Sequence, residues 1–378
     1  MTNQTTPTSH AQHPMPAEFA ADWQLSPGEL LADELKHRGI SQTEFAARTS
    51  LSTKHVNQIV KGHVTLSSDA AIAFERALNV PATLWLRAEA VWRAAETART
   101  SRIALGQFAN WLSQFPLQAL FKRGIIAVQD DIGTQIDKLL RWFEVSDPQA
   151  FDRVRLQPEA SFKRSQAFTV QPYATAVWLR LAEVEAERLT DSAGSFSTRL
   201  LKKAAHQLPA LTTLDTKTAF VRAQELLKEA GVLLVFVEEI EGTRISGASK
   251  MLESGHHMIA LTGRFKTLDS FWFALAHEVA HVLLHPKRST YIDVDLSVND
   301  DDDEQESEAN AYAERLFLPP EAKERLRAAR SGQGILLLAK ELQVAPFMLA
   351  GQYGHMTQQW KVVGRMRKRE NLGEILKA

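Results

Sequence analysis

The sequence of 378 residues contains no cysteine. This absence excludes disulfides, thiol catalysis and cysteine-ligated zinc, and it is typical of the reducing cytoplasm. Lys and Arg number 44 against 45 Asp and Glu. The resulting net charge of −1 predicts no general attraction to nucleic acid or to anionic membranes. Any DNA-binding surface must therefore be local.

Long hydrophobic runs are also missing. The longest apolar stretches, such as GVLLVFV at 231–237, are too short to cross a bilayer. Residues 1–16 are polar and rich in Thr and Pro, and they lack the basic and apolar regions of a signal peptide. We therefore expect a cytoplasmic protein without membrane contact, whose first 16 residues form a disordered tail.

Short amphipathic patterns fill residues 27–100 and predict a series of helices. In GISQTEFAARTS, Ser41 followed by Glu44 is typical of a capping box. In LSTKHVNQIVKG, Ser52 can cap a helix and Gly62 can end it in the left-handed conformation. Two short helices in this order are typical of a helix-turn-helix, whose second helix enters the major groove of DNA.

The second of these helices carries polar side chains on its outward face. They are Thr53, Lys54, Asn57, Gln58 and Lys61. Lys54 suits guanine or phosphate, and Asn57 and Gln58 suit adenine. Gln42, at the start of the preceding helix, can contact a phosphate. Residues 27–102 hold 10 Lys and Arg against 8 Asp and Glu, so the alternative of a bundle that docks a protein stays open.

The segment ALAHEVAHVLLH at 274–285 places two imidazoles and a carboxylate in a run that is otherwise apolar. On a helix, His277 and His281 lie on one face and can bind one metal ion. Glu278 is rotated by about 100° from His277, beside the ion and not on it. A base that takes a proton from zinc-activated water stands in that place. The pattern HExxH therefore predicts a zinc site with Glu278 as general base.

A third ligand must come from another segment. In DDDEQESEANAYAERLFLP at 301–319, Glu306 and Asn310 share one helical face. We expect Glu306 to bind the metal and Asn310 to orient a metal-bound histidine. Glu304 and Glu308 are competing candidates for the ligand, whereas residues 300–303 fit a solvated loop. Three ligands with a nearby base imply an open coordination position, unlike a structural zinc site with four ligands.

Several other polar residues lie near the motif. His285 follows His281 by one helical turn, and we expect it to miss the metal and to serve a structural role. His256 and His257 flank the start of a strand and are candidates for stabilising a tetrahedral intermediate, although a surface position without a catalytic role is favoured. Tyr291 and Arg264 are candidates for the same role with no stronger support.

FWFALAHEVAHVLLH followed by EQESEANAYAERLFLP resembles the ImmA/IrrE family of bacterial metallopeptidases. The similarity runs from about 230 to 320 and includes the strand region SGASKMLESGHHMIALTGRFK. Tyr312 stands where the family usually has Phe. The N-terminal part resembles HigA-type antitoxins with a Cro/repressor-like helix-turn-helix, in the stretch from HPMPAEFAADWQLSPGELLADEL through LWLRAEAVW. The middle part is similar to that of chains that combine both domains, in the stretches NWLSQFPLQALFKRG and FKRSQAF. The resemblance implies zinc dependence and cleavage of repressor-type proteins.

These observations predict an α+β protein in four parts. They are the tail at 1–16, an all-α helix-turn-helix domain at 17–102, a helical linking region at 103–230, and a zincin-like metallopeptidase domain at 231–378. The last part should contain a small sheet with buried strands at 231–240 and 256–264, the HExxH helix, and a helical C-terminal extension.

Two functions compete. The first is a zinc endopeptidase, latent until activated, that cleaves a repressor or antitoxin-type regulator in a stress, phage or toxin–antitoxin response. The second is a non-enzymatic antitoxin-like transcriptional regulator whose metal domain is structural or sensory. Both have operator DNA as a partner, and a toxin and a second copy of the chain are further partner candidates. Intact Glu278 favours the enzyme.

Overall fold

The computed structural model describes residues 25–156, 171–264, 266–285, 290–294, 304–329 and 331–376. The predicted tail at 1–16 and the acidic run at 300–303 lie outside the described residues. The chain divides into two compact units, Met1–Gly106 and Gln107–Ala378. Residues 107–230 thus share a unit with the HExxH segment. In the described part of the chain, no helix combines the length and the apolar character that a membrane span requires.

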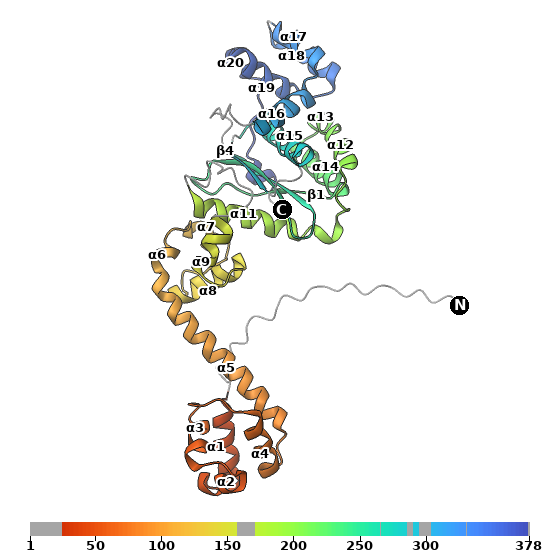
Figure 1. The fold of residues 1–378 in the computed structure, drawn as a ribbon. Helices are drawn as coiled ribbons and strands as arrows, with labels where there is room; N and C mark the ends of the chain where they lie inside the picture. Colours follow the sequence, from red (N-terminus) through yellow and green to blue (C-terminus); the bar gives the residue numbers. More distant parts are fainter. Residues whose placement is uncertain are drawn as a thin grey trace, which may run out of the picture. The chain divides into compact units, whose positions relative to one another are not determined.

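The first unit is all helical (Figure 1). Its helices are α1 (Pro27–Arg38), α2 (Gln42–Thr49), α3 (Thr53–Val60), α4 (Ser68–Leu78) and α5 (Ala82–Leu105). A serine precedes each of the first four helices, and its hydroxyl accepts a hydrogen bond from a backbone N–H of the first turn. The full capping box lies at Ser26 and Glu29. At the predicted box, Ser41 accepts from the Glu44 N–H, but the Glu44 carboxylate pairs with Arg48 at 2.5 Å.

An aromatic cluster fixes the core of this unit. Phe74 of α4 packs edge-on against Phe45 of α2 and Trp85 of α5, with ring centroids 5.0 and 5.5 Å apart. Gly28 of α1 lies against α3 so closely that a Cβ there would stand 2.3 Å from the carbonyl oxygen of Ile59. Only glycine therefore fits at this crossing, and the close contact sets the orientation of α3 within the unit.

The second unit is built around a four-stranded sheet with the strand order β1-β3-β2-β4. The strands are β1 (Val232–Phe236), β2 (Ile245–Met251), β3 (His257–Leu261) and β4 (Thr290–Val294). β3 pairs in parallel with β1, and β2 pairs antiparallel with both β3 and β4. The strands predicted at 231–240 and 256–264 correspond to β1 and β3. The described chain is an α+β protein, so the predicted fold class is confirmed.

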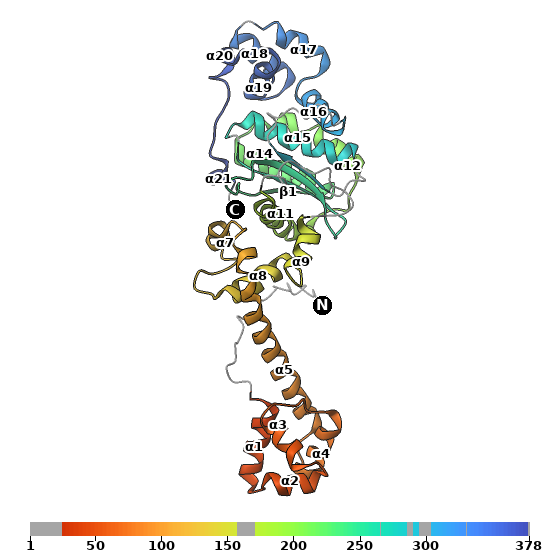
Figure 2. The same ribbon diagram turned by 60° about the vertical axis from the view of Figure 1, so that its left-hand side comes forward.

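Helices cover both faces of the sheet (Figure 2). α11 (Pro172–Glu187) lies on one face, where the indole N–H of Trp178 donates to the carbonyl oxygen of Val237 at 3.4 Å. On the other face lie α12 (Thr198–Ala205), α14 (Thr216–Glu229) and α15 (Leu268–Leu284), which carries the HExxH motif. Ahead of α11 are α6 (Ala109–Leu112), α7 (Leu117–Lys122), α8 (Ile132–Phe143), α9 (Pro148–Phe151) and η2 (Asp152–Leu156).

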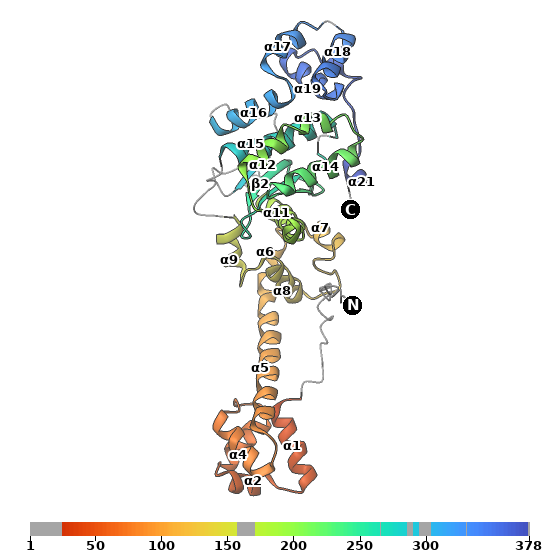
Figure 3. The same cartoon turned by 90° about the vertical axis from the view of Figure 1, so that its right-hand side faces the viewer.

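The second unit contains further helices beside α15 and beyond it (Figure 3). They are α13 (Leu208–Leu211), α16 (Glu304–Phe317), α17 (Pro320–Arg327), α18 (Gly332–Leu342), α19 (Pro346–Thr357), α20 (Trp360–Val363) and α21 (Leu372–Ile375). The chain between α20 and α21 returns to the start of α15, where Leu268 N–H donates to the carbonyl oxygen of Lys368 at 3.0 Å. The Arg367 guanidinium binds the buried Asp269 carboxylate at 2.8 Å. These contacts hold the first turn of α15 in place.

Candidate metal centre

The motif helix α15 is buried along nearly its whole length, between the sheet and the helices on that face. His277 and Glu278 have no exposed surface, and His281 is 1% exposed. Buried polar groups are costly unless they are paired. The apolar residues around the motif explain why this helix is buried. The three polar side chains of the motif therefore require partners inside the protein.

Two imidazoles and one carboxylate converge at the centre of this helix. The Nε2 atoms of His277 and His281 lie 2.9 Å apart. Glu306, from the first turn of α16, places Oε2 3.1 Å from Nε2 of His277 and Oε1 3.4 Å from Nε2 of His281. One ligand atom from each of the three residues lies within 4.8 Å of the others. The group could therefore hold a single ion.

The environment keeps these donors in the form that binds metal. Burial, the largest effect, lowers the pKa of His281 to about 4, so its imidazole is neutral near pH 7. Burial raises the pKa of Glu306, but hydrogen bonds to His277 and His281 outweigh it and hold the pKa well below its ordinary value. Asn310 places Oδ1 3.0 Å from Nδ1 of His277, which leaves Nε2 of that ring for the ion.

This donor set fits zinc. Two histidines and one glutamate are the protein ligands of one class of catalytic zinc sites, in which a further coordination position stays open. The Glu306 side chain is 35% exposed, whereas both imidazoles are buried. Solvent therefore approaches the three donors from the side of α16.

Glu278 occupies the place beside the donors that the helical spacing predicts, and it lies against β2. A Cβ built on Gly247 would stand 2.9 Å from Oε1 and 3.2 Å from Cγ of Glu278. The ladder of β2 and β4 shifts its register between Ile245 and Gly247. A glycine inside a strand often marks a close approach, and a bulge often adjoins an active site. Gly247 was not singled out from the sequence. A glycine within a stretch that forms a strand was the signal that could have identified it.

The competing acidic residues lie away from this group. Glu308 places Oε2 3.5 Å from Nε2 of His285, and Glu304 is exposed at the start of α16. The ring of His285 lies 5.7 Å from that of His281, centroid to centroid. Within the described residues, Glu306 alone of the three candidate glutamates joins the two histidines.

The remaining sequence candidates near the motif have other surroundings. His257 is buried on β3 with its ring 4.4 Å from that of Phe196, and burial lowers its pKa. His256 lies 3.0 Å from the Ser254 hydroxyl, and Arg264 pairs with Glu239 at 3.2 Å. The side chain of Tyr291 lies outside the described residues.

The candidate DNA contacts lie on α3, at Lys61 directly after α3, and at the start of α2, in the first unit. Thr53, Lys54 and Lys61 are exposed, whereas Asn57 and Gln58 are half-buried. The Asn57 amide donates to the side-chain oxygen of Gln42 at 3.2 Å, which joins the two helices. An amide held in this way keeps fewer hydrogen-bonding positions for a base edge. Sequence reasoning did not foresee this pairing.

Two family models match parts of the chain. Residues 228–351 match an M78 peptidase model, described as the IrrE N-terminal-like domain, and residues 31–85 match a helix-turn-helix model. The chain joins a helix-turn-helix domain to an IrrE-type domain. A search of curated proteins found no match to it.

The IrrE-type match spans the whole of the candidate centre. It runs from the penultimate residue of α14 to the middle of α19, so it includes β1, β2, β3, α15 and α16. The helix-turn-helix match includes α2 and α3 with the candidate DNA contacts. The domain on which the metal group lies is thus of a metallopeptidase type, and the first unit has a DNA-binding type of fold.

Proposed function

We propose that this protein is a zinc-dependent endopeptidase whose helix-turn-helix domain binds DNA. One observation carries the proposal. The Nε2 atoms of His277 and His281 and the carboxylate of Glu306 converge, while Glu278 stands beside them on the same buried helix. A site that was only structural would need a fourth protein ligand and no adjacent carboxylate.

Each residue has a distinct part in the proposed chemistry. A zinc ion held there would supply Lewis acidity and lower the pKa of water toward neutrality. Glu278 accepts a proton from the water that attacks the peptide carbonyl carbon and then donates it to the departing amine nitrogen. Asn310 holds the ring of His277 through Nδ1 and so keeps Nε2 directed at Glu306.

The protein substrate is proposed to be a repressor or antitoxin-type regulator, and the site of action to be operator DNA. The presence of both domain types in one chain supports this pairing. The DNA-reading helix would be α3, with Thr53, Lys54 and Lys61 outward. We further propose that the DNA-binding domain ends near residue 102, as expected from the sequence.

Replacement of Glu278 by Gln tests the enzyme directly. The amide keeps the shape of the side chain but cannot accept a proton. Cleavage of a purified repressor-type protein encoded next to this chain should therefore fall by at least about 100-fold. Zinc content and thermal unfolding should stay as in wild type. If Glu278→Gln cleaves the substrate as fast as wild type, the mechanism is rejected. The non-enzymatic regulator, with a structural or sensory metal, is then the better account.

A further inference from the structure

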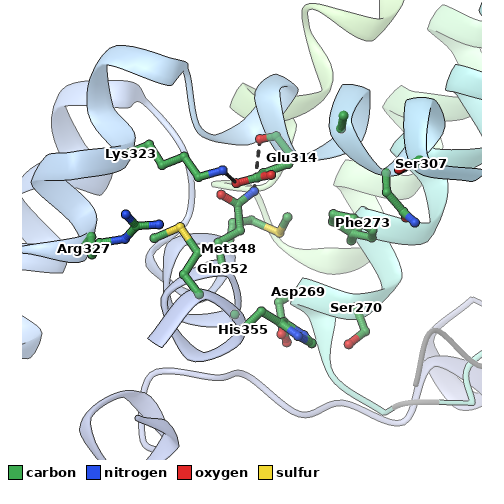
Figure 4. A pocket seen from close by; sticks show the side chains of 14 residues that line it. Asp269, Ser270, Phe273, Ser307, Glu314, Lys323, Arg327, Met348, Gln352 and His355 are labelled. Atoms are coloured by element: carbon green, nitrogen blue, oxygen red, sulfur yellow. Dashed lines mark hydrogen bonds and ion pairs between the residues drawn. The ribbon is translucent and has the colours of Figure 1, made fainter. Parts of the chain in front are cut away.

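A cavity of about 550 Å³ lies between α15, α16, α17 and α19, next to the metal centre (Figure 4). This volume is typical of sites that bind small molecules. Figure 4 shows Lys323 and Arg327 of α17 on one side, with Asp269, Ser270 and His355 on another. The proposed chemistry uses none of these side chains.

The wall of the cavity combines an apolar surface with cations on one side. Phe273, Met348 and Met356 supply the apolar part, and methionine adapts its shape to varied ligands. The acidic groups are already held, because Lys323 pairs with Glu314 at 2.6 Å and Arg367 pairs with Asp269.

Arg327 is the cation best placed to meet a ligand. Arg327 forms an ion pair with Glu324 at 3.2 Å, and the Glu324 side chain is 77% exposed. A pair so open to solvent contributes little, so it competes weakly with a ligand anion. Arginine also binds carboxylate, sulfonate or phosphate groups through its planar fork of donors.

The cavity also shares residues with the helices of the metal centre. Asn310, whose Oδ1 lies 3.0 Å from His277, lines it, and so does Ser307, the neighbour of Glu306. Phe273 lies one turn ahead of His277 on α15. A molecule in the cavity would therefore contact the same helical faces that position two of the three metal-binding side chains.

We infer that this cavity binds a small anionic molecule with an apolar body, and that its binding is coupled to the metal centre through Asn310. The coupling rests on the metal site proposed above, whereas the cavity and its anion preference do not. By linkage, the molecule and the metal change each other's affinity by the same factor.

Two naphthalene probes that differ in one group test the anion preference on the full chain. These are 1-anilinonaphthalene-8-sulfonate and N-phenyl-1-naphthylamine, which lacks the sulfonate. Fluorescence titration should show that Arg327→Gln weakens the sulfonate probe by about fivefold or more and leaves the neutral probe unchanged. Arg325→Gln is the matched control, because Arg325 lies on the same helix but pairs with Glu341 at 2.6 Å.

The coupling is measured by repeating the sulfonate titration with zinc-free and zinc-loaded protein. We expect the two dissociation constants to differ by about fivefold or more, and Asn310→Ala to abolish the difference. Equal sulfonate binding by Arg327→Gln and wild type, or equal loss of both probes, would overturn the anion site. Equal sulfonate affinity with and without zinc would overturn the coupling. Failure of the chain to bind zinc would refute the proposed function, while the Arg327→Gln titration would still decide the cavity.

Discussion

Replacing Gly247 with alanine would add a methyl group 2.9 Å from Oε1 of Glu278 and 3.2 Å from its Cγ. Non-bonded atoms pack best about 3.5–4.0 Å apart, so the carboxylate would have to move by roughly half an ångström or more. Leu261 Cδ2 lies 3.2 Å from the same point, so the methyl group would also crowd this second side chain. Glu278 is the closer of the two, so the displacement falls mainly on it.

The expected cost to catalysis follows from that displacement. A misplacement of 1 Å can cost about 100-fold, so a shift near half of that should lower kcat by roughly tenfold. Zinc content should stay at the wild-type value, because the three atoms nearest to the methyl group belong to Glu278 and Leu261 and not to the metal-binding residues. The free energy of unfolding should fall by about 1–3 kcal/mol, as is usual for overpacking.

The assay compares cleavage of a purified repressor-type substrate with zinc analysis of the same preparation. Gly334→Ala is the control, because its new methyl group would meet nothing closer than the Cβ of Ala329 at 3.6 Å. Unchanged kcat in Gly247→Ala would refute the close packing of Glu278 against β2. Loss of zinc would instead mean that the displaced carboxylate is a ligand and not a base.

Two other perturbations examine parts of the chain outside the metal centre. Replacing Lys54 and Asn57 with Ala should weaken binding to the chain's own promoter by about 1–3 kcal/mol per lost base contact, and unchanged electrophoretic retardation would exclude α3 as the reader. Glu183→Gln should lower the free energy of unfolding at pH 7 by about 3–5 kcal/mol, because it removes the buried carboxylate that pairs with Arg155, Arg180 and Lys250. Burial raises the pKa of Glu183, but Lys250 and Arg155 lower it below its ordinary value of 4.5. The carboxylate therefore stabilises the fold above pH 4.5, and urea titrations should show the difference from the variant shrinking as the pH falls below that value. A difference that grows toward acid would contradict this assignment.

Local sequence patterns predicted many of the helices and strands. The serine caps of the first unit and the apolar runs of β1 and β3 are properties of a few adjacent residues, and they predicted the elements correctly. β2 was harder to predict from its own residues, because ISGASKM is rich in small and polar side chains. Its position depends on pairing with β3 and on the packing of α15 against Gly247.

The same division applies to the candidate centre. The spacing of His277, Glu278 and His281 follows from one helix, so the sequence alone predicts their relative placement. Contacts between segments far apart in the sequence could not be predicted from local patterns. Arg367, for example, lies 98 residues from its partner Asp269 in the sequence. The cavity at Asn310 is formed by four helices together and has no signature in any one of them.

Zinc analysis of four purified proteins tests the central claim most directly. Wild type, Glu278→Gln and Glu308→Gln should each contain about one zinc per chain, whereas Glu306→Gln should lose most of it, because removal of one of three ligands lowers metal affinity sharply. Glu308 is the matched control, since it lies on the same helix but beside His285. Full zinc in Glu306→Gln, or loss of zinc in Glu278→Gln, would contradict a site formed by His277, His281 and Glu306.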